Sequence, residues 1–81
     1  MRVTVLLFAG AREAAGADQV DVQLPDGATY AGLAEALRHA FPPLERLATT
    51  ARFAADAAYV DLSEPVDLAA EIALIPPVSG G

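Results

Sequence analysis

The last six residues are the part of the sequence whose types and order could take part in chemistry. They read Pro76-Pro77-Val78-Ser79-Gly80-Gly81 and follow an apolar stretch. Consecutive prolines favour polyproline geometry, which would project the chain end away from the body. Because glycine has no Cβ, Gly80 and Gly81 can thread a narrow channel in another protein. The group presented there is an unhindered carboxylate, which must be activated before it reacts, for instance as a mixed anhydride with AMP.

The alternative for these glycines is a frayed chain end without a function. The double proline and the apolar strand-like residues before it favour the functional interpretation. We therefore expect a domain at residues 1–75 and a flexible tail at residues 76–81.

The rest of the sequence offers few other catalytic candidates. His39 is the only histidine, and the chain has no cysteine to pair with it. Ser63 and Ser79 lack the surroundings of a nucleophile elbow. Four carboxylates lie close together in sequence: Asp61, Glu64, Asp67 and Glu71. They could form a metal site or an acid–base pair, but their places near turns favour a solvated rim. We expect no metal or cofactor on this chain, and the residues do not predict an independent enzyme.

The charge and composition exclude several classes of partner. The net charge is −6, and all five basic residues are arginines. A protein that binds the nucleic-acid backbone needs clustered cations, so nucleic acid is not expected as a partner. No apolar run reaches the roughly 20 residues of a membrane-spanning helix. Without cysteine or a signal-peptide pattern, we expect a cytoplasmic protein.

The spacing of apolar residues predicts an α+β domain whose mixed sheet has one main helix packed across it. The expected strands are residues 2–9, 18–24, 52–55, 58–62 and 71–75, and the expected helices are a short turn at 10–16, a main helix from Thr29 to about Phe41, and a second short helix at 44–51. The first strand is apolar on both faces and should be central, whereas the second alternates cleanly. We expect these two strands to form an antiparallel hairpin.

Three stretches resemble the small subunit of molybdopterin synthase, a ubiquitin-like (β-grasp) sulfur carrier of the ThiS-like type. They are residues 7–16 (LFAGAREAAG), residues 24–29 (LPDGAT) and, most specifically, residues 71–81 (EIALIPPVSGG). The resemblance implies that an E1-like enzyme uses ATP to adenylate the Gly81 carboxylate and that a sulfur donor system converts it to a thiocarboxylate. The tail would then deliver sulfur to cyclic pyranopterin monophosphate on the large synthase subunit, in a heterotetramer.

The resemblance also implies a docking surface. Phe8 and Ile75 would belong to an apolar patch that contacts partners, with Arg12 at its rim. The alternative for Phe8 and Ile75 is simple packing in the core. Two expected turns, at residues 56–58 and 68–70, lack the glycines that the family often has there, and we expect them to be looser or differently shaped.

Other functions share the same tail chemistry. A sulfur carrier for thiamine or for tRNA thiolation would have the same fold and the same Gly-Gly end. A ubiquitin-like modifier would be joined through Gly81 to lysines of other proteins. A noncovalent interaction domain would not need the tail at all.

Overall fold

The two alternating segments at the start of the chain form a hairpin. In the computed structural model, which describes residues 1–76, β1 (Arg2–Leu7) pairs antiparallel with β2 (Gln19–Gln23). Val3 lies opposite Val22, and all of the inward valines of the two strands are buried. The hairpin predicted from the alternation is confirmed.

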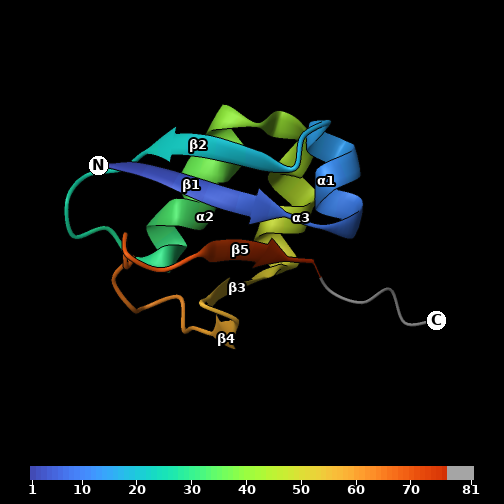
Figure 1. Cartoon of the computed structure of the whole chain (residues 1–81). Helices are drawn as coiled ribbons and strands as arrows, with labels where there is room; N and C mark the ends of the chain where they lie inside the picture. Colours follow the sequence, from blue (N-terminus) through green and yellow to red (C-terminus); the bar gives the residue numbers. More distant parts are fainter. Residues whose placement is uncertain (77–81) are drawn as a thin grey trace.

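The last strand of the described chain lies in the middle of the sheet. β5 (Ile72–Ile75) pairs parallel with β1 and antiparallel with β3 (Arg52–Ala55), and β4 (Ala58–Tyr59) forms an edge. The five strands have the order β2-β1-β5-β3-β4 (Figure 1). A parallel neighbour on one side and an antiparallel neighbour on the other make the sheet mixed, as predicted.

The main helix covers one face of this sheet. α2 (Tyr30–Ala40) begins after Thr29, whose hydroxyl oxygen accepts a hydrogen bond from the Gly32 amide at 3.3 Å. Its apolar stripe is buried and consists of Tyr30, Leu33, Ala34 and Leu37. In the core the stripe meets buried side chains of β1, β3 and β5, among them Leu7, Phe53 and Leu74. The predicted N-cap, the helix and its apolar face are all confirmed.

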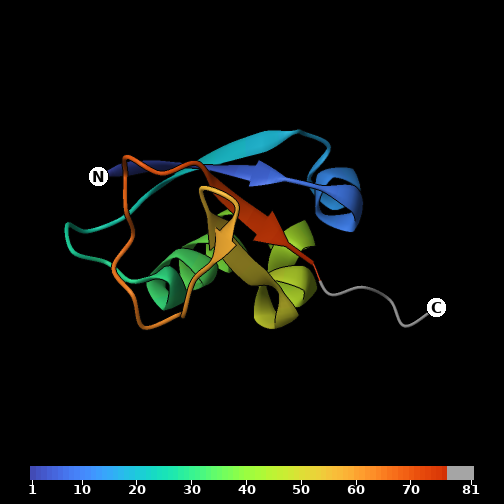
Figure 2. The same cartoon turned by 60° about the horizontal axis from the view of Figure 1, so that its bottom comes forward.

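Three shorter elements complete the helical side. They are α1 (Ala9–Ala15), the 3-10 turn η1 (Pro42–Leu44) and α3 (Glu45–Thr50). Figures 1 and 2 show α2 and α3 on the same side of the strands. Among residues 1–76, no element covers the other face of the sheet.

Four predicted strands are longer than the structure has them, and two of these end well before the predicted residue. The first ends at Leu7, not at residue 9, because the chain turns at Ala9 with a φ of 49° and enters α1. The predicted strand at 58–62 is only Ala58–Tyr59, because the carbonyl groups of Leu62 and Glu64 accept hydrogen bonds from the first amides of α2. The segment therefore caps a helix and does not extend a sheet.

The two turns without glycine are well defined. Asp56 and Ala57 form a two-residue hairpin turn with φ of 49° and 66°, the signs that a type I′ turn requires. The Ala70 amide donates to the Asp67 carbonyl at 3.1 Å, and the Ala69 amide donates to the Asp67 carboxylate at 2.9 Å. The expectation of looser turns is therefore wrong at both places, and the expectation of a different shape stays a prediction.

The division into a domain at 1–75 and a tail at 76–81 stays a prediction, since residues 77–81 lie outside the described part of the chain. Among the residues that the structure describes, no helix has the length and apolar character that a bilayer-spanning segment needs.

Candidate functional site

The uncovered face of the sheet carries a row of apolar side chains. Leu6 of β1 is the register partner of Ala73 of β5, Ala73 lies opposite Ala54 of β3, and Ala54 lies opposite Tyr59 of β4. Residues that lie directly opposite each other in a sheet point to the same face. Four strands therefore contribute to one surface, on the side away from α2.

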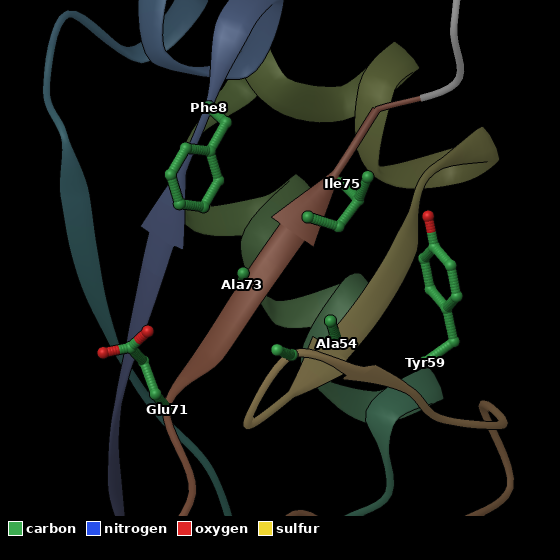
Figure 3. Close-up of a pocket in the computed structure, with 7 residues that line it drawn as sticks. Phe8, Ala54, Tyr59, Glu71, Ala73 and Ile75 are labelled. Atoms are coloured by element: carbon green, nitrogen blue, oxygen red, sulfur yellow. The ribbon is translucent and has the colours of Figure 1, made fainter.

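This surface is hollowed. An open cavity of about 300 Å³, called the sheet-face hollow below, is lined by Phe8, Ala54, Ala57, Tyr59, Glu71, Ala73 and Ile75. Figure 3 shows Phe8, Ile75 and Tyr59 standing around the small side chains of Ala73 and Ala54, with Glu71 at the end away from Ile75. The hollow exists because two alanines lie between larger neighbours.

Phe8 and Ile75 do not belong to the core. Phe8 is 47% exposed and Ile75 is half-buried, and both line the sheet-face hollow. The alternative of simple core packing is therefore excluded for these two residues. A contiguous apolar surface of this kind is typical of an interaction site, but the assignment of Phe8 and Ile75 to a partner interface stays a prediction.

Arg12 lies apart from the hollow. It is exposed on α1, and its guanidinium is 3.7 Å from the Asp18 carboxylate. It is not among the residues that line the sheet-face hollow. Its predicted contact with a partner also stays a prediction.

A different arginine lies beside the hollow. Arg52 is opposite Ile75 in the register of β3 and β5, so the two side chains share the uncovered face. Its guanidinium carbon lies 4.0 Å from the centre of the Tyr59 ring. At this distance the cation is attracted by the π face of the ring, which holds a positive charge next to the apolar surface.

Strand β5 connects this surface with the chain end. Ile75 is its last residue, and half-buried Pro76 follows. Because β5 is hydrogen-bonded to a strand on each side, Ile75 and the start of the predicted tail at Pro76 have a fixed position beside the hollow. The other predicted tail residues, Pro77, Val78, Ser79, Gly80 and Gly81, lie outside the described part of the chain.

The remaining candidates do not assemble into a site. His39 is exposed, with its Nε2 atom 3.9 Å from Glu35 one helical turn earlier. The acidic residues at 61–71 serve local turns: the Glu64 carboxylate accepts from the Asp61 amide at 2.7 Å. Within residues 1–76, no three histidine, aspartate or glutamate side chains come together as metal ligands.

One carboxyl group on the uncovered face is electrostatically perturbed, and it lies away from the hollow. Asp21 of β2 accepts a hydrogen bond from the Thr4 hydroxyl at 2.6 Å and another from Arg2. Both interactions, the Thr4 bond first, favour the ionised form and hold the pKa of Asp21 below its usual value. This cluster joins the outer surfaces of β1 and β2.

Sequence reasoning missed Ala54, Ala73, Tyr59 and Arg52 as parts of the surface. Ala73 could have been placed on the outer face from its position between Ile72 and Leu74, but the short segments of the other three residues do not show which face they occupy. The signal that places them is the pairing of β3, β4 and β5, and this register depends on contacts between distant parts of the chain.

Residues 5–81 match the family model described as the ThiS family. The chain belongs to the ThiS family. The family match confirms the resemblance found in the sequence, and the likeness of this structure to solved structures of ubiquitin-like proteins confirms the predicted β-grasp fold.

Three relatives of this chain carry the same name, and two of them are described here. The protein called molybdopterin synthase sulfur carrier subunit in Arabidopsis thaliana is 36% identical, over all of this chain and 84% of that protein. The protein of that name in Chlamydomonas reinhardtii is 38% identical over all of both chains. Among solved structures, SAMP1 (small archaeal modifier protein 1) from Haloferax volcanii has 31% identity and a TM-score of 0.83, and the match covers both chains completely.

Proposed function

We propose that this ThiS-family chain is the sulfur carrier subunit of a molybdopterin synthase. The observation that carries the proposal is the match of 34–38% identity, over almost the whole chain, to three proteins with that name. The family match also extends to residue 81, so it includes the Gly-Gly end.

The proposed chemistry takes place at Gly81. An oxygen of its carboxylate attacks the α-phosphorus of ATP on an E1-like activating enzyme, and pyrophosphate leaves. A persulfide of a donor protein then attacks the carbonyl carbon and displaces AMP, which leaves an acyl disulfide. A second thiol of the donor system attacks the donor's sulfur in this disulfide, so that the two donor thiols are oxidised to a disulfide and the thiocarboxylate leaves. The tail carries this sulfur to cyclic pyranopterin monophosphate on the large synthase subunit, and two such transfers build the dithiolene of molybdopterin. This chain itself binds no cofactor in the proposal.

The body of the domain supplies the docking surface and the direction of the tail. Phe8 and Ile75 of the sheet-face hollow contact the large subunit, and Arg12 adds a polar contact at the periphery. β5 holds Pro76, from which Pro77, Val78, Ser79, Gly80 and Gly81 extend into the active site of the partner. The assembly is a cytoplasmic heterotetramer of two small and two large subunits.

A reconstituted reaction tests the carrier role. The chain is incubated with an activating enzyme, ATP, a sulfur source and the large subunit, and its intact mass and the molybdopterin formed are measured. We expect one oxygen to be replaced by sulfur at Gly81, and we expect deletion of Gly81 or addition of one residue to abolish both readouts. Gly10→Ala is a suitable control, because a Cβ at Gly10 meets no atom within 4 Å. Synthase activity that survives deletion of Gly81 contradicts the mechanism.

The pathway is tested by the partner that is recovered. Co-purification from cells with a molybdopterin synthase large subunit supports the proposal. Recovery with a thiazole synthase or a tRNA-thiolating enzyme, without the large subunit, assigns the same tail chemistry to a different pathway and overturns this one.

A second candidate function is that of a protein modifier. It is favoured by the 31% identity and the TM-score of 0.83 to SAMP1. In this role the Gly81 carbonyl is joined to a lysine amine on another protein. The test is a blot of cells that express the tagged chain: ladders of higher mass that disappear when Gly81 is deleted support conjugation, and their absence leaves only the carrier role.

A further inference from the structure

Arg52 carries a positive charge that no carboxylate of the described chain balances. The ion pairs within residues 1–76 are Met1–Asp26, Arg2–Asp21, Arg12–Asp18 and His39–Glu35, and none includes Arg52. An exposed arginine without a partner is common and by itself means little. What distinguishes Arg52 is that its head group is oriented by the Tyr59 ring.

The stacking prepares the guanidinium for a carboxylate. A guanidinium that lies on an aromatic ring keeps its N–H donors at the edge of its plane, where they match both oxygens of a carboxylate. Since the side chain is already held against the ring, less conformational freedom is lost when such a pair forms. Tyr59 is itself 58% exposed and lines the sheet-face hollow, so the stacked pair lies at the surface that a partner would cover.

The position of Arg52 relates this charge to the tail. Arg52 lies opposite Ile75, the residue before Pro76, so the charge is at the tail end of the sheet-face hollow. Glu71 lies at the other end (Figure 3). The hollow therefore has an apolar centre with a positive charge at one end and a negative charge at the other, and this polarity defines a direction for whatever binds there.

We propose that Arg52, held on Tyr59, pairs with a carboxylate of the synthase large subunit, next to an apolar side chain that enters the sheet-face hollow. The inference rests on the proposed function and deepens it by naming a specificity-determining contact. A partner without a carboxylate at this place would bury the guanidinium unpaired, which is strongly unfavourable. Arg52 therefore selects the partner and fixes the orientation in which the domain docks, and with it the direction in which the tail enters the large subunit.

The test compares charge variants at two positions. Binding of the large subunit from the same organism is measured by titration calorimetry at low and high salt, for the full chain and for Arg52→Glu, Arg52→Gln and Arg52→Lys. Arg46→Glu is the matched control, because Arg46 is an exposed arginine on α3, the helical side of the domain. Melting temperatures confirm that each variant folds.

We expect Arg52→Glu and Arg52→Gln to weaken binding by about tenfold or more and to reduce its salt dependence. Arg52→Lys should recover only part of the affinity, since it keeps the charge but loses the planar fork. Arg46→Glu should stay within about twofold of the unmodified chain. Replacing the matching carboxylate residue of the large subunit by arginine should restore the binding of Arg52→Glu.

The failures of the two proposals are distinguishable. If the unmodified chain does not bind the large subunit, the proposed function fails and this inference fails with it. If the unmodified chain binds and a folded Arg52→Gln or Arg52→Glu binds equally well, or Arg46→Glu weakens binding as much, the carboxylate contact is refuted while the carrier role stands.

Discussion

Ala54 on β3 and Ala73 on β5 lie directly opposite each other on the uncovered face of the sheet. Their methyl groups are too small to fill the space between Phe8, Tyr59 and Ile75, and the sheet-face hollow results. A single pair of small residues in two adjacent strands thus determines whether this face is flat or can receive a side chain of another protein.

Filling the hollow should block docking without harming the fold. Ala73 is half-buried on the outer face, so Ala73→Leu adds volume outside the core and should change the free energy of unfolding by no more than about 0.5 kcal/mol. Binding to the large subunit should weaken by about tenfold or more, because the apolar side chain of the partner loses its space. Ala40→Leu, the same change at an exposed helix end, should bind normally. Unchanged binding by Ala73→Leu would show that the hollow is not a docking site.

The hairpin turn at Asp56 and Ala57 should be improved by glycine. Ala57 has a φ of 66°, a left-handed conformation that costs a residue with a Cβ about 1–2 kcal/mol. Part of the gain is offset by the greater freedom of glycine in the unfolded chain, so Ala57→Gly should stabilise the domain by about 0.5–1 kcal/mol. Urea unfolding measures the difference. Ala58→Gly, at a position with ordinary strand geometry, should destabilise the domain, and a loss of stability in both variants would contradict the argument.

Removing the cap of α2 should cost about 1 kcal/mol. The Thr29 hydroxyl accepts a hydrogen bond from the Gly32 amide, which otherwise has no partner within the helix. Thr29→Ala deletes the acceptor and should lower the free energy of unfolding by about 1 kcal/mol. Thr29→Ser keeps the hydroxyl and should unfold with nearly the same free energy as the unmodified chain. Thermal melts followed by circular dichroism compare the two, and equal losses in both variants would show that the threonine acts through its methyl group instead.

The Asp21 cluster should give a pH-dependent contribution to stability. The folded pKa of Asp21 lies below the ordinary value of 3.8, so the contribution is complete above about pH 5 and is lost as the pH falls through the folded pKa. Asp21→Asn should therefore melt at a lower temperature than the unmodified chain near pH 6, and the difference should shrink below about pH 4. A difference that stays constant down to about pH 2 would show that ionisation of Asp21 contributes nothing. Thr4→Val should remove part of the same pH dependence.

The features predicted from the sequence are those with a local cause. The alternation of Val20 and Val22 fixes which face of β2 is inward, and Thr29 with the spacing of Leu33 and Leu37 fixes the start and the buried side of α2. The Gly-Gly end stands out because of its composition alone. In each case a few neighbouring residues contain the whole signal.

The features that were missed depend on distant contacts or on backbone angles that the residue type does not favour. The apolar run at the start continues through Phe8, yet the strand ends because Ala9 adopts a positive φ without being a glycine. Tyr59 and Arg52 meet over the hollow only because β3, β4 and β5 pair in one particular register. No local pattern reports such a register, so the sequence predicted the sheet and, through the resemblance, Phe8 and Ile75, but not the other residues that line or flank the sheet-face hollow.

The central place of β5 has a consequence for the order of events when the protein is made. β1 and β3 are not neighbours in the sheet, and only β5, residues 72–75, connects them. The ribosome makes these residues after all the other strands, so a nascent chain can form the β1–β2 hairpin early but cannot complete its sheet. The sheet-face hollow and the fixed position of Pro76 therefore arise in the same step, and a chain whose synthesis stops before residue 72 has neither of them.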